Sequence, residues 1–193
     1  MAETFPTDSL SNAAREVLRL DVMDAYTALV PDRSGSEAAK TLLEKLNEQT
    51  VVNAPVRSQS DAMSLLAGLW LWHDYLGESH SISQKIETGT GSFWHAIMHR
   101  REGDFSNSKY WYARCSGHPI LATLAVRADD IIKPFPADKS LLKLTAAGWN
   151  ANAFVDLVEQ VHDRPDDPRH KAAIALQQLE WRTLFDHCQR SAV

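Results

Sequence analysis

Residues 60–76 read SDAMSLLAGLWLWHDYL, and the apolar side chains in this run cover every face of a helix. A helix that is apolar all round lies at the centre of its protein. The run is shorter than the roughly 20 apolar residues that a bilayer span needs, and His73 and Asp74 interrupt it. We therefore expect a central, enclosed helix and no membrane span.

Shorter amphipathic segments flank this run and are separated by proline, glycine and helix-capping residues. Pro31 is expected to end the first helix, and Gly103 is expected to end the helix at 93–102. Asp167 is expected to cap the last helix. We expect helices at residues 9–30, 36–48, 60–76, 93–102, 104–115, 119–128, 138–147, 150–161 and from 167 onward, with a loop at 49–58. Thr90 or Ser92 is expected to cap the helix at 93–102, and Asp104 or Ser106 the next.

The composition agrees with a helical domain. The chain has 193 residues, of which 44% are hydrophobic and 23% are charged, as in an ordinary globular protein. Alanine and leucine outnumber valine and isoleucine, which favours helices over strands. We expect an all-α fold: a single domain over residues 1–193, built as a bundle of about eight helices, with a flexible N-terminus at residues 1–8.

Charge and cysteine content indicate the class of partner and the compartment. Twenty Lys and Arg residues stand against 25 Asp and Glu residues, so the surface lacks the positive charge that nucleic-acid binding requires. Cys115 and Cys188 lie far apart and form no zinc or disulfide motif, which favours a reducing environment. Residues 1–9 lack the pattern of a secretory signal. We expect a cytoplasmic protein that does not bind nucleic acid or membranes.

Polar functional groups concentrate in one part of the chain. Five of the eight histidines and four of the six tryptophans fall between residues 70 and 118. Within this region, residues 92–112 read SFWHAIMHRREGDFSNSKYWY. On a helix, His95, His99 and Glu102 follow at spacings of four and three, so they share one face. Two imidazoles and a carboxylate in this pattern can hold a divalent metal such as zinc or iron, although a solvated polar face would have the same pattern.

The preceding helix could supply further ligands. His73 and Asp74 fall on its apolar stripes and should be buried, and a buried carboxylate needs an arginine, a histidine or a metal as partner. If that helix continues through Gly77, His80 joins the stripe of His73. Two such helices facing each other would offer the imidazoles and carboxylates that helical bundles use for metal ions. Alternatively, His73 and Asp74 satisfy backbone or arginine groups in the core.

Four cations follow the histidine pair, namely Arg100, Arg101, Lys109 and Arg114. Guanidinium groups bind carboxylate or phosphate at two points, so a small anionic ligand is expected. On the helix at 104–115, Asn107, Tyr110 and Arg114 share a stripe that could line the same pocket. The alternative is an internal ion-pair network, in which the arginines pair with Asp74, Glu78, Glu102 and Asp104.

The run from Ser92 to Trp111, with Trp72-His73-Asp74 before it and Gly117-His118-Pro119 after it, resembles a segment of an uncharacterised family of bacterial and fungal proteins. The resemblance covers about a quarter of the chain and implies no activity and no catalytic residue. The chain is also similar to metal-binding four-helix proteins of the DinB type, which use His-x-x-x-His and one earlier histidine. His73 or His80 would take that third place. In those proteins the pair lies on the last helix, whereas four more helices are expected here.

Two functions remain open from the sequence. The first is a metal-dependent enzyme with a polar pocket between residues 65–80 and 93–114, in which the cations orient a small anionic substrate and the metal supports hydrolysis or oxygen chemistry. The second is a non-catalytic ligand-binding or assembly module whose histidines and arginines form a structural polar core. The sequence leaves the reaction, the metal and the formation of a homo-oligomer open.

Overall fold

The computed structural model describes residues 8–22, 25–135 and 137–193, and these residues form ten α-helices and no β-strand. The predicted all-α fold is confirmed, with ten helices in place of about eight. The helices are α1 (Asn12–Arg19), α2 (Glu37–Leu43), α3 (Gln59–Trp72), α4 (Leu76–Ser83), α5 (Gly89–Glu102), α6 (Phe105–Ala113), α7 (Ile120–Ile132), α8 (Lys139–Leu142), α9 (Ala151–Val161) and α10 (Pro168–Ala192). None of the helices among these residues is long and apolar enough to cross a bilayer.

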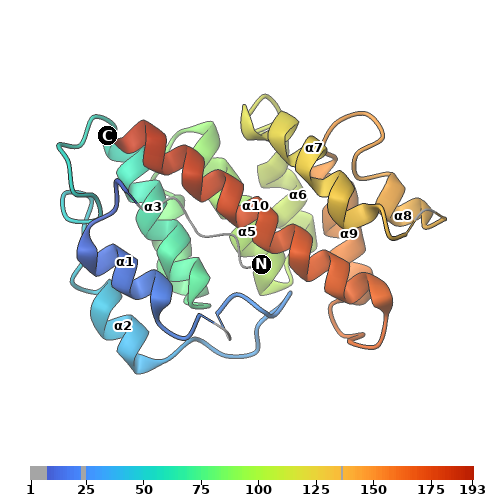
Figure 1. The fold of residues 1–193 in the computed structure, drawn as a ribbon, viewed down its shortest axis with the longest axis horizontal. Helices are drawn as coiled ribbons and strands as arrows, with labels where there is room; N and C mark the ends of the chain where they lie inside the picture. The colour runs from blue at the N-terminus through green and yellow to red at the C-terminus, as the bar shows by residue number, and fades with distance from the viewer. Residues whose placement is uncertain (1–7, 23–24, 136) are drawn as a thin grey trace.

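The long C-terminal helix α10 organises the molecule. It runs across the whole bundle, with α1 and α2 on one side and α7 to α9 on the other (Figure 1). It packs against α3, α7 and α9, while α5 packs against α3, α4 and α6. The interior therefore lies where α3, α5 and α10 meet.

Aromatic side chains fill this interior. The Trp181 ring of α10 lies 4.7 Å from Trp72 and 6.0 Å from Trp94 between ring centroids, and its indole nitrogen donates to the Gly68 carbonyl at 2.9 Å. A Cβ at Gly68 would meet the Trp94 ring at 2.9 Å, so α3 and α5 approach this closely only because position 68 is glycine. The buried side chains of α3 confirm that the helix in the apolar run is central.

Helix α3 ends earlier than a continuous helix through Gly77 would require. His73 is its C-terminal cap, and Asp74 takes a left-handed backbone conformation with φ of 61°. The chain turns there and starts α4 at Leu76. The condition that one helix continues through Gly77 is not met, and the helix expected at 60–76 ends at Trp72. The break lies at Asp74, a residue type that tolerates positive φ better than most.

Most expected helix starts agree with the structure, whereas the expected ends at residues 30, 48, 76, 128 and 147 do not. Asp104 and Asp167 cap α6 and α10, and Gly103 ends α5 with φ of 86°. Thr88, rather than Thr90 or Ser92, caps α5, whose first turn therefore includes both glycines. The expected helices at 9–30 and 138–147 are much shorter. The first stops at Arg19, because Leu20 is extended and Asp21 and Tyr26 have positive φ.

Candidate metal centre

Three histidines from two helices come together beside α6. His80 lies on α4, and His95 and His99 lie one turn apart on α5. One ring nitrogen from each lies within 4.8 Å of the others. We call these three residues the histidine cluster. The turn at Asp74 makes it, because α4 is thereby free to pack back against α5.

The rings of the cluster lie face to edge and face to face. The His80 ring is 4.7 Å from His95 and 5.4 Å from His99 between centroids, and the His95 and His99 rings stack at 4.8 Å. Three nitrogens bound to one tetrahedral zinc at about 2.1 Å lie roughly 3.4 Å apart. The 4.8 Å limit exceeds this spacing, so the histidine side chains would have to rotate to hold an ion.

His95 is the most unusual member of the cluster. Its side chain is buried, with 3% of the residue exposed, and neither ring nitrogen has a hydrogen-bond partner among the described residues. The ring is held between His99 and the Trp111 indole, which stacks on it at 4.1 Å. Burial, assisted by His99 and His80, lowers the pKa of His95 to about 4. The imidazole is therefore neutral at pH 7, with a lone pair available to a ligand.

Glu102 and Asn107 orient His99. The Glu102 carboxylate lies 3.0 Å from His99 Nδ1, so Nδ1 carries the proton and Nε2 is left to accept. Asn107 Nδ2 lies 3.1 Å from that Nε2. Burial lowers the pKa of His99, and the Glu102 hydrogen bond and charge oppose this effect. A carboxylate behind a histidine is the usual support of a metal ligand. The sequence predicted Glu102 as a ligand, but the structure places it behind His99 and brings His80 into the cluster.

Arg100 turns away from the cluster into the core. It is fully buried and forms an ion pair with Glu180 of α10 at 2.7 Å. Its Nη1 donates to the Tyr112 hydroxyl at 2.5 Å, and the guanidinium lies 4.5 Å from the centroid of the Phe154 ring. Burial opposes the charge, but the Glu180 carboxylate outweighs this effect and raises the pKa of Arg100. Arg100 therefore joins α5 to α10.

Arg101 is also buried, and it stabilises the turn that follows α3. It pairs with Asp74 at 2.6 Å and donates to the carbonyls of Leu71 and Ala28 at 2.8 and 3.0 Å. Its guanidinium lies 4.0 Å from the centroid of the Tyr26 ring. Asp74 thus has the arginine partner that its position requires, as the ion-pair alternative predicts. No pattern in the sequence indicated Glu180 as a partner, because it lies far along the chain from Arg100.

His73 faces a different part of the molecule. Its Nε2 lies 2.8 Å from the Val17 carbonyl of α1, and burial lowers its pKa. Together with Asp74, Arg33 and Gly35, it lines a separate cavity of about 370 Å³. The structure does not bring His73 and Asp74 into the histidine cluster.

The remaining predicted residues lie on α6. Lys109 pairs with Asp156 at 2.6 Å. Arg114 is exposed, and its guanidinium lies 3.9 Å from the Tyr110 ring centroid and 5.2 Å from that of Trp111. In the part of the chain that the structure describes, no carboxylate pairs with Arg114. Of the four predicted cations, Arg114 is therefore the one that is left to bind a ligand beside the cluster.

Trp111 is the residue that sequence reasoning missed. It forms one wall of the cluster by stacking on His95. Its spacing of four from Asn107 and three from Arg114 could have indicated that it shares their face.

The comparisons with known proteins found no similarity. No protein-family model matches the chain, and no curated protein and no solved structure matches it. The chemistry of the histidine cluster is therefore argued from its distances and contacts alone.

Proposed function

We propose that this protein is a metal-dependent enzyme whose ion, zinc or ferrous iron, is bound by His80, His95 and His99. The observation that carries the proposal is His95, a buried imidazole in contact with two further histidines, whose two nitrogens have no hydrogen-bond partner among the described residues. A buried polar group without a partner costs about 1–3 kcal/mol. Coordination of a metal by His95 would offset this free-energy cost.

Three neutral imidazoles suit catalysis better than a purely structural site. Neutral ligands do not reduce the positive charge of the ion. Three of them leave a fourth coordination position for water, as in zinc enzymes with three histidine ligands. Such an ion lowers the pKa of bound water to about 7 and polarises a substrate oxygen. The Glu102 carboxylate behind His99 would fix that ring and increase its basicity.

The substrate that we propose is a small anionic molecule. Asn107, Trp111 and Arg114 follow at spacings of four and three on α6, and the first two contact members of the histidine cluster. Arg114 would bind a carboxylate or phosphate at two points. The Asn107 amide, which contacts His99 Nε2 in the structure, would turn to the substrate once the metal takes that nitrogen. Arg100 and Arg101 have no part in this proposal, because both pair with carboxylates in the interior.

A second candidate function is a non-catalytic module with a structural polar core. The buried pair of Arg100 and Glu180 favours it, since this pair joins two helices without any ligand. It does not account for His95, whose nitrogens have no partner in such a core.

Metal analysis of purified, tag-free protein tests the proposal. We expect one equivalent of a divalent metal in the wild type, and loss of the metal in His80→Gln, His95→Gln and His99→Gln. His118→Gln is the matched control for the buried His95, and His162→Gln the control for the half-buried His80. Both controls should keep the metal. Wild-type protein that stays metal-free after exposure to micromolar zinc or ferrous iron would refute the metal site.

Enzyme activity is tested on the metal-loaded protein. We expect hydrolysis of a phosphate or carboxylate ester that carries a negative charge, lost on chelation and restored by metal. Arg114→Gln should reduce kcat/KM for this substrate about tenfold, as expected for a lost charged hydrogen bond, and should leave metal content unchanged. Stoichiometric metal without any activity on charged substrates would favour the non-catalytic module.

A further inference from the structure

The side chain of Asn107 on α6 contacts one member of the histidine cluster. Its Nδ2 lies 3.1 Å from His99 Nε2 and 3.4 Å from His99 Nδ1. The Glu102 carboxylate lies 3.0 Å from Nδ1, so Nδ1 carries the proton of the ring. The Asn107 amide therefore donates its hydrogen bond to the lone pair of Nε2.

A metal ion needs the same lone pair. An imidazole binds a metal through its unprotonated nitrogen, which in His99 is Nε2. At His95, in contrast, neither nitrogen has a hydrogen-bond partner among the described residues. An amide N–H cannot stay at hydrogen-bond distance from Nε2 once an ion occupies its lone pair. Asn107 and a metal therefore compete for this one atom.

The start of α6 holds the backbone of Asn107 in this place. Asp104 caps the helix by accepting from Asn107 N at 3.1 Å. The next residue, Ser108, is buried, and its hydroxyl donates to the Ala96 carbonyl of α5 at 2.8 Å. Because these bonds fix the backbone against α5, a rotation of the Asn107 side chain is what releases Nε2.

The release of the amide costs about one hydrogen bond. Asn107 is half-buried, so its rotated side chain reaches water or a bound molecule and not an apolar interior. The net contribution of one hydrogen bond corresponds to a factor of about ten in a binding constant. Asn107 should lower the affinity of the cluster for a metal by this factor.

We infer that Asn107 regulates the proposed metal site by competing with the ion for His99 Nε2. This inference rests on the proposed function, since it requires that the histidine cluster binds a metal. It gives Asn107 a role opposite to that of a ligand, because its removal strengthens metal binding. It also orders the two binding events, since the amide turns toward the substrate only after the metal has displaced it.

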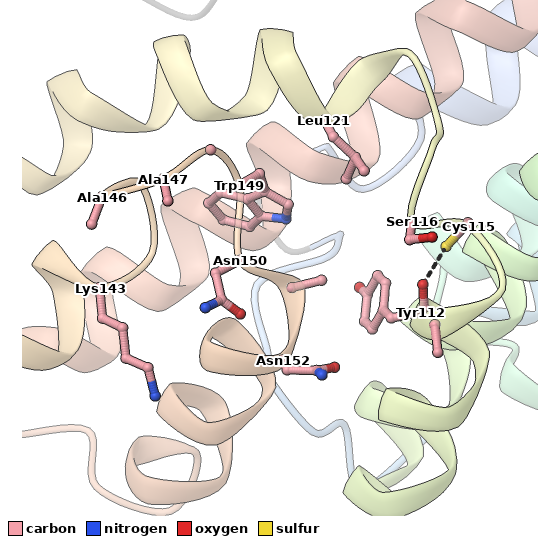
Figure 2. Close-up of a pocket in the computed structure, with 13 residues that line it drawn as sticks. Tyr112, Cys115, Ser116, Leu121, Lys143, Ala146, Ala147, Trp149, Asn150 and Asn152 are labelled. Atoms are coloured by element: carbon pink, nitrogen blue, oxygen red, sulfur yellow. Dashed lines mark hydrogen bonds between the residues drawn. The ribbon is translucent and has the colours of Figure 1, made fainter.

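Zinc binding in competition with a chelator of known affinity tests the inference. Asn107→Ala and Asn107→Leu should each bind zinc about tenfold more tightly than the wild type. Leucine keeps the approximate size of the side chain, so the gain should not depend on an opened space. Asn152→Ala is the control and should bind zinc like the wild type. Figure 2 shows Asn152 on α9 beside another cavity, and none of that cavity's lining residues belongs to the histidine cluster.

A double-variant cycle with His99 isolates the contact. In a His99→Gln background, Asn107→Ala should no longer strengthen whatever zinc binding remains, because the atom for which Asn107 competes is gone. A gain of the same size in this background would overturn the inference. A purely structural role of Asn107 predicts the opposite sign in the single variants, because loss of local structure weakens binding.

The inference and the proposed function fail in different ways. If the wild type binds zinc and neither Asn107→Ala nor Asn107→Leu binds it more tightly, Asn107 does not compete with the ion, and the metal site itself stands. If neither the wild type nor any Asn107 variant binds zinc at micromolar concentration, the metal site is refuted, and the inference falls with it.

Discussion

At the scale of single residues, Arg100 and His95 lie on the same helix and are both buried, but their polar atoms have different surroundings. Arg100 has a carboxylate at 2.7 Å and a tyrosine hydroxyl at 2.5 Å. His95 has two imidazoles and an indole around it and no hydrogen bond to either nitrogen among the described residues. The first arrangement is complete in the folded chain, and the metal that we propose would complete the second.

The pairing of Arg100 predicts a large effect of removing Glu180. Glu180→Gln leaves a buried guanidinium without its charge partner, which should lower the free energy of unfolding by about 3–5 kcal/mol. The double variant Arg100→Met/Glu180→Leu should lose less than Glu180→Gln alone, because it buries no unpaired charge. Urea unfolding measures both. Glu159→Gln, which changes an exposed residue on α9, is the control. An equal loss of unfolding free energy in Glu180→Gln and Glu159→Gln would contradict the prediction.

His118 predicts a dependence of stability on pH. It is buried against Thr90, Phe93 and His187, and burial together with His187 lowers its pKa from 6.5 to about 4. As the pH falls from 6.5 to 4, the unfolded chain takes up this proton before the folded one does. The free energy of unfolding should therefore decrease, by roughly 3 kcal/mol from this residue.

Urea unfolding at a series of pH values checks this prediction. His118→Gln should show a shallower loss of stability between about pH 6.5 and pH 4 than the wild type. Identical slopes in the two proteins would show that His118 does not contribute to this acid sensitivity.

At the scale of helices, periodicity predicted what depends on one helix and failed where two helices must meet. The spacing of His95, His99 and Glu102 correctly placed their side chains on neighbouring turns of α5. His80 reaches them only because the chain turns at Asp74, and no repeat in the sequence marks a positive φ at that residue. The inward direction of Arg100 depends on Glu180, a residue of another helix. Local spacing carries no information on such a partner.

Two glycines in α4 and α5 test how closely these elements pack. A Cβ at Gly91 would lie 2.2 Å from the Ile86 carbonyl oxygen, whereas one at Gly77 would meet nothing within 4 Å. Gly91→Ala should therefore destabilise the protein by about 1–3 kcal/mol, because backbone must shift. Gly77→Ala should stabilise it by up to about 1 kcal/mol through helix propensity. Thermal unfolding distinguishes the two, and a stabilising Gly91→Ala would show that α5 starts differently.

At the scale of the whole molecule, α10 closes the interior by packing against α3, α7 and α9. Trp181 and Glu180 on α10 contact α3 and α5. A cavity of about 490 Å³ is assembled from residues 112–121 and 143–152, which are separate segments of the sequence. The all-α fold follows from composition and periodicity, but cavities between distant segments depend on how the helices pack, which those patterns do not specify.

The histidine cluster predicts that a metal stabilises the whole molecule, because the ligands join α4 to α5 in the folded state only. At a free metal concentration one hundred times Kd, linkage adds about 2.7 kcal/mol to the free energy of unfolding. For a chain of this size, that gain should raise Tm by about 5–10 °C. Differential scanning calorimetry with zinc, and then with a chelator, should show the rise and its reversal.

His80→Gln separates this effect from unspecific metal binding. The variant removes the single ligand on α4 and keeps both histidines of α5, so any weak binding of zinc that this pair retains cannot join the helices. Its Tm should rise much less with zinc than that of the wild type, whereas His162→Gln, half-buried like His80, should respond like the wild type. An equal rise in His80→Gln would mean that α4 does not take part in metal binding, and the site would then be reduced to the His95 and His99 pair.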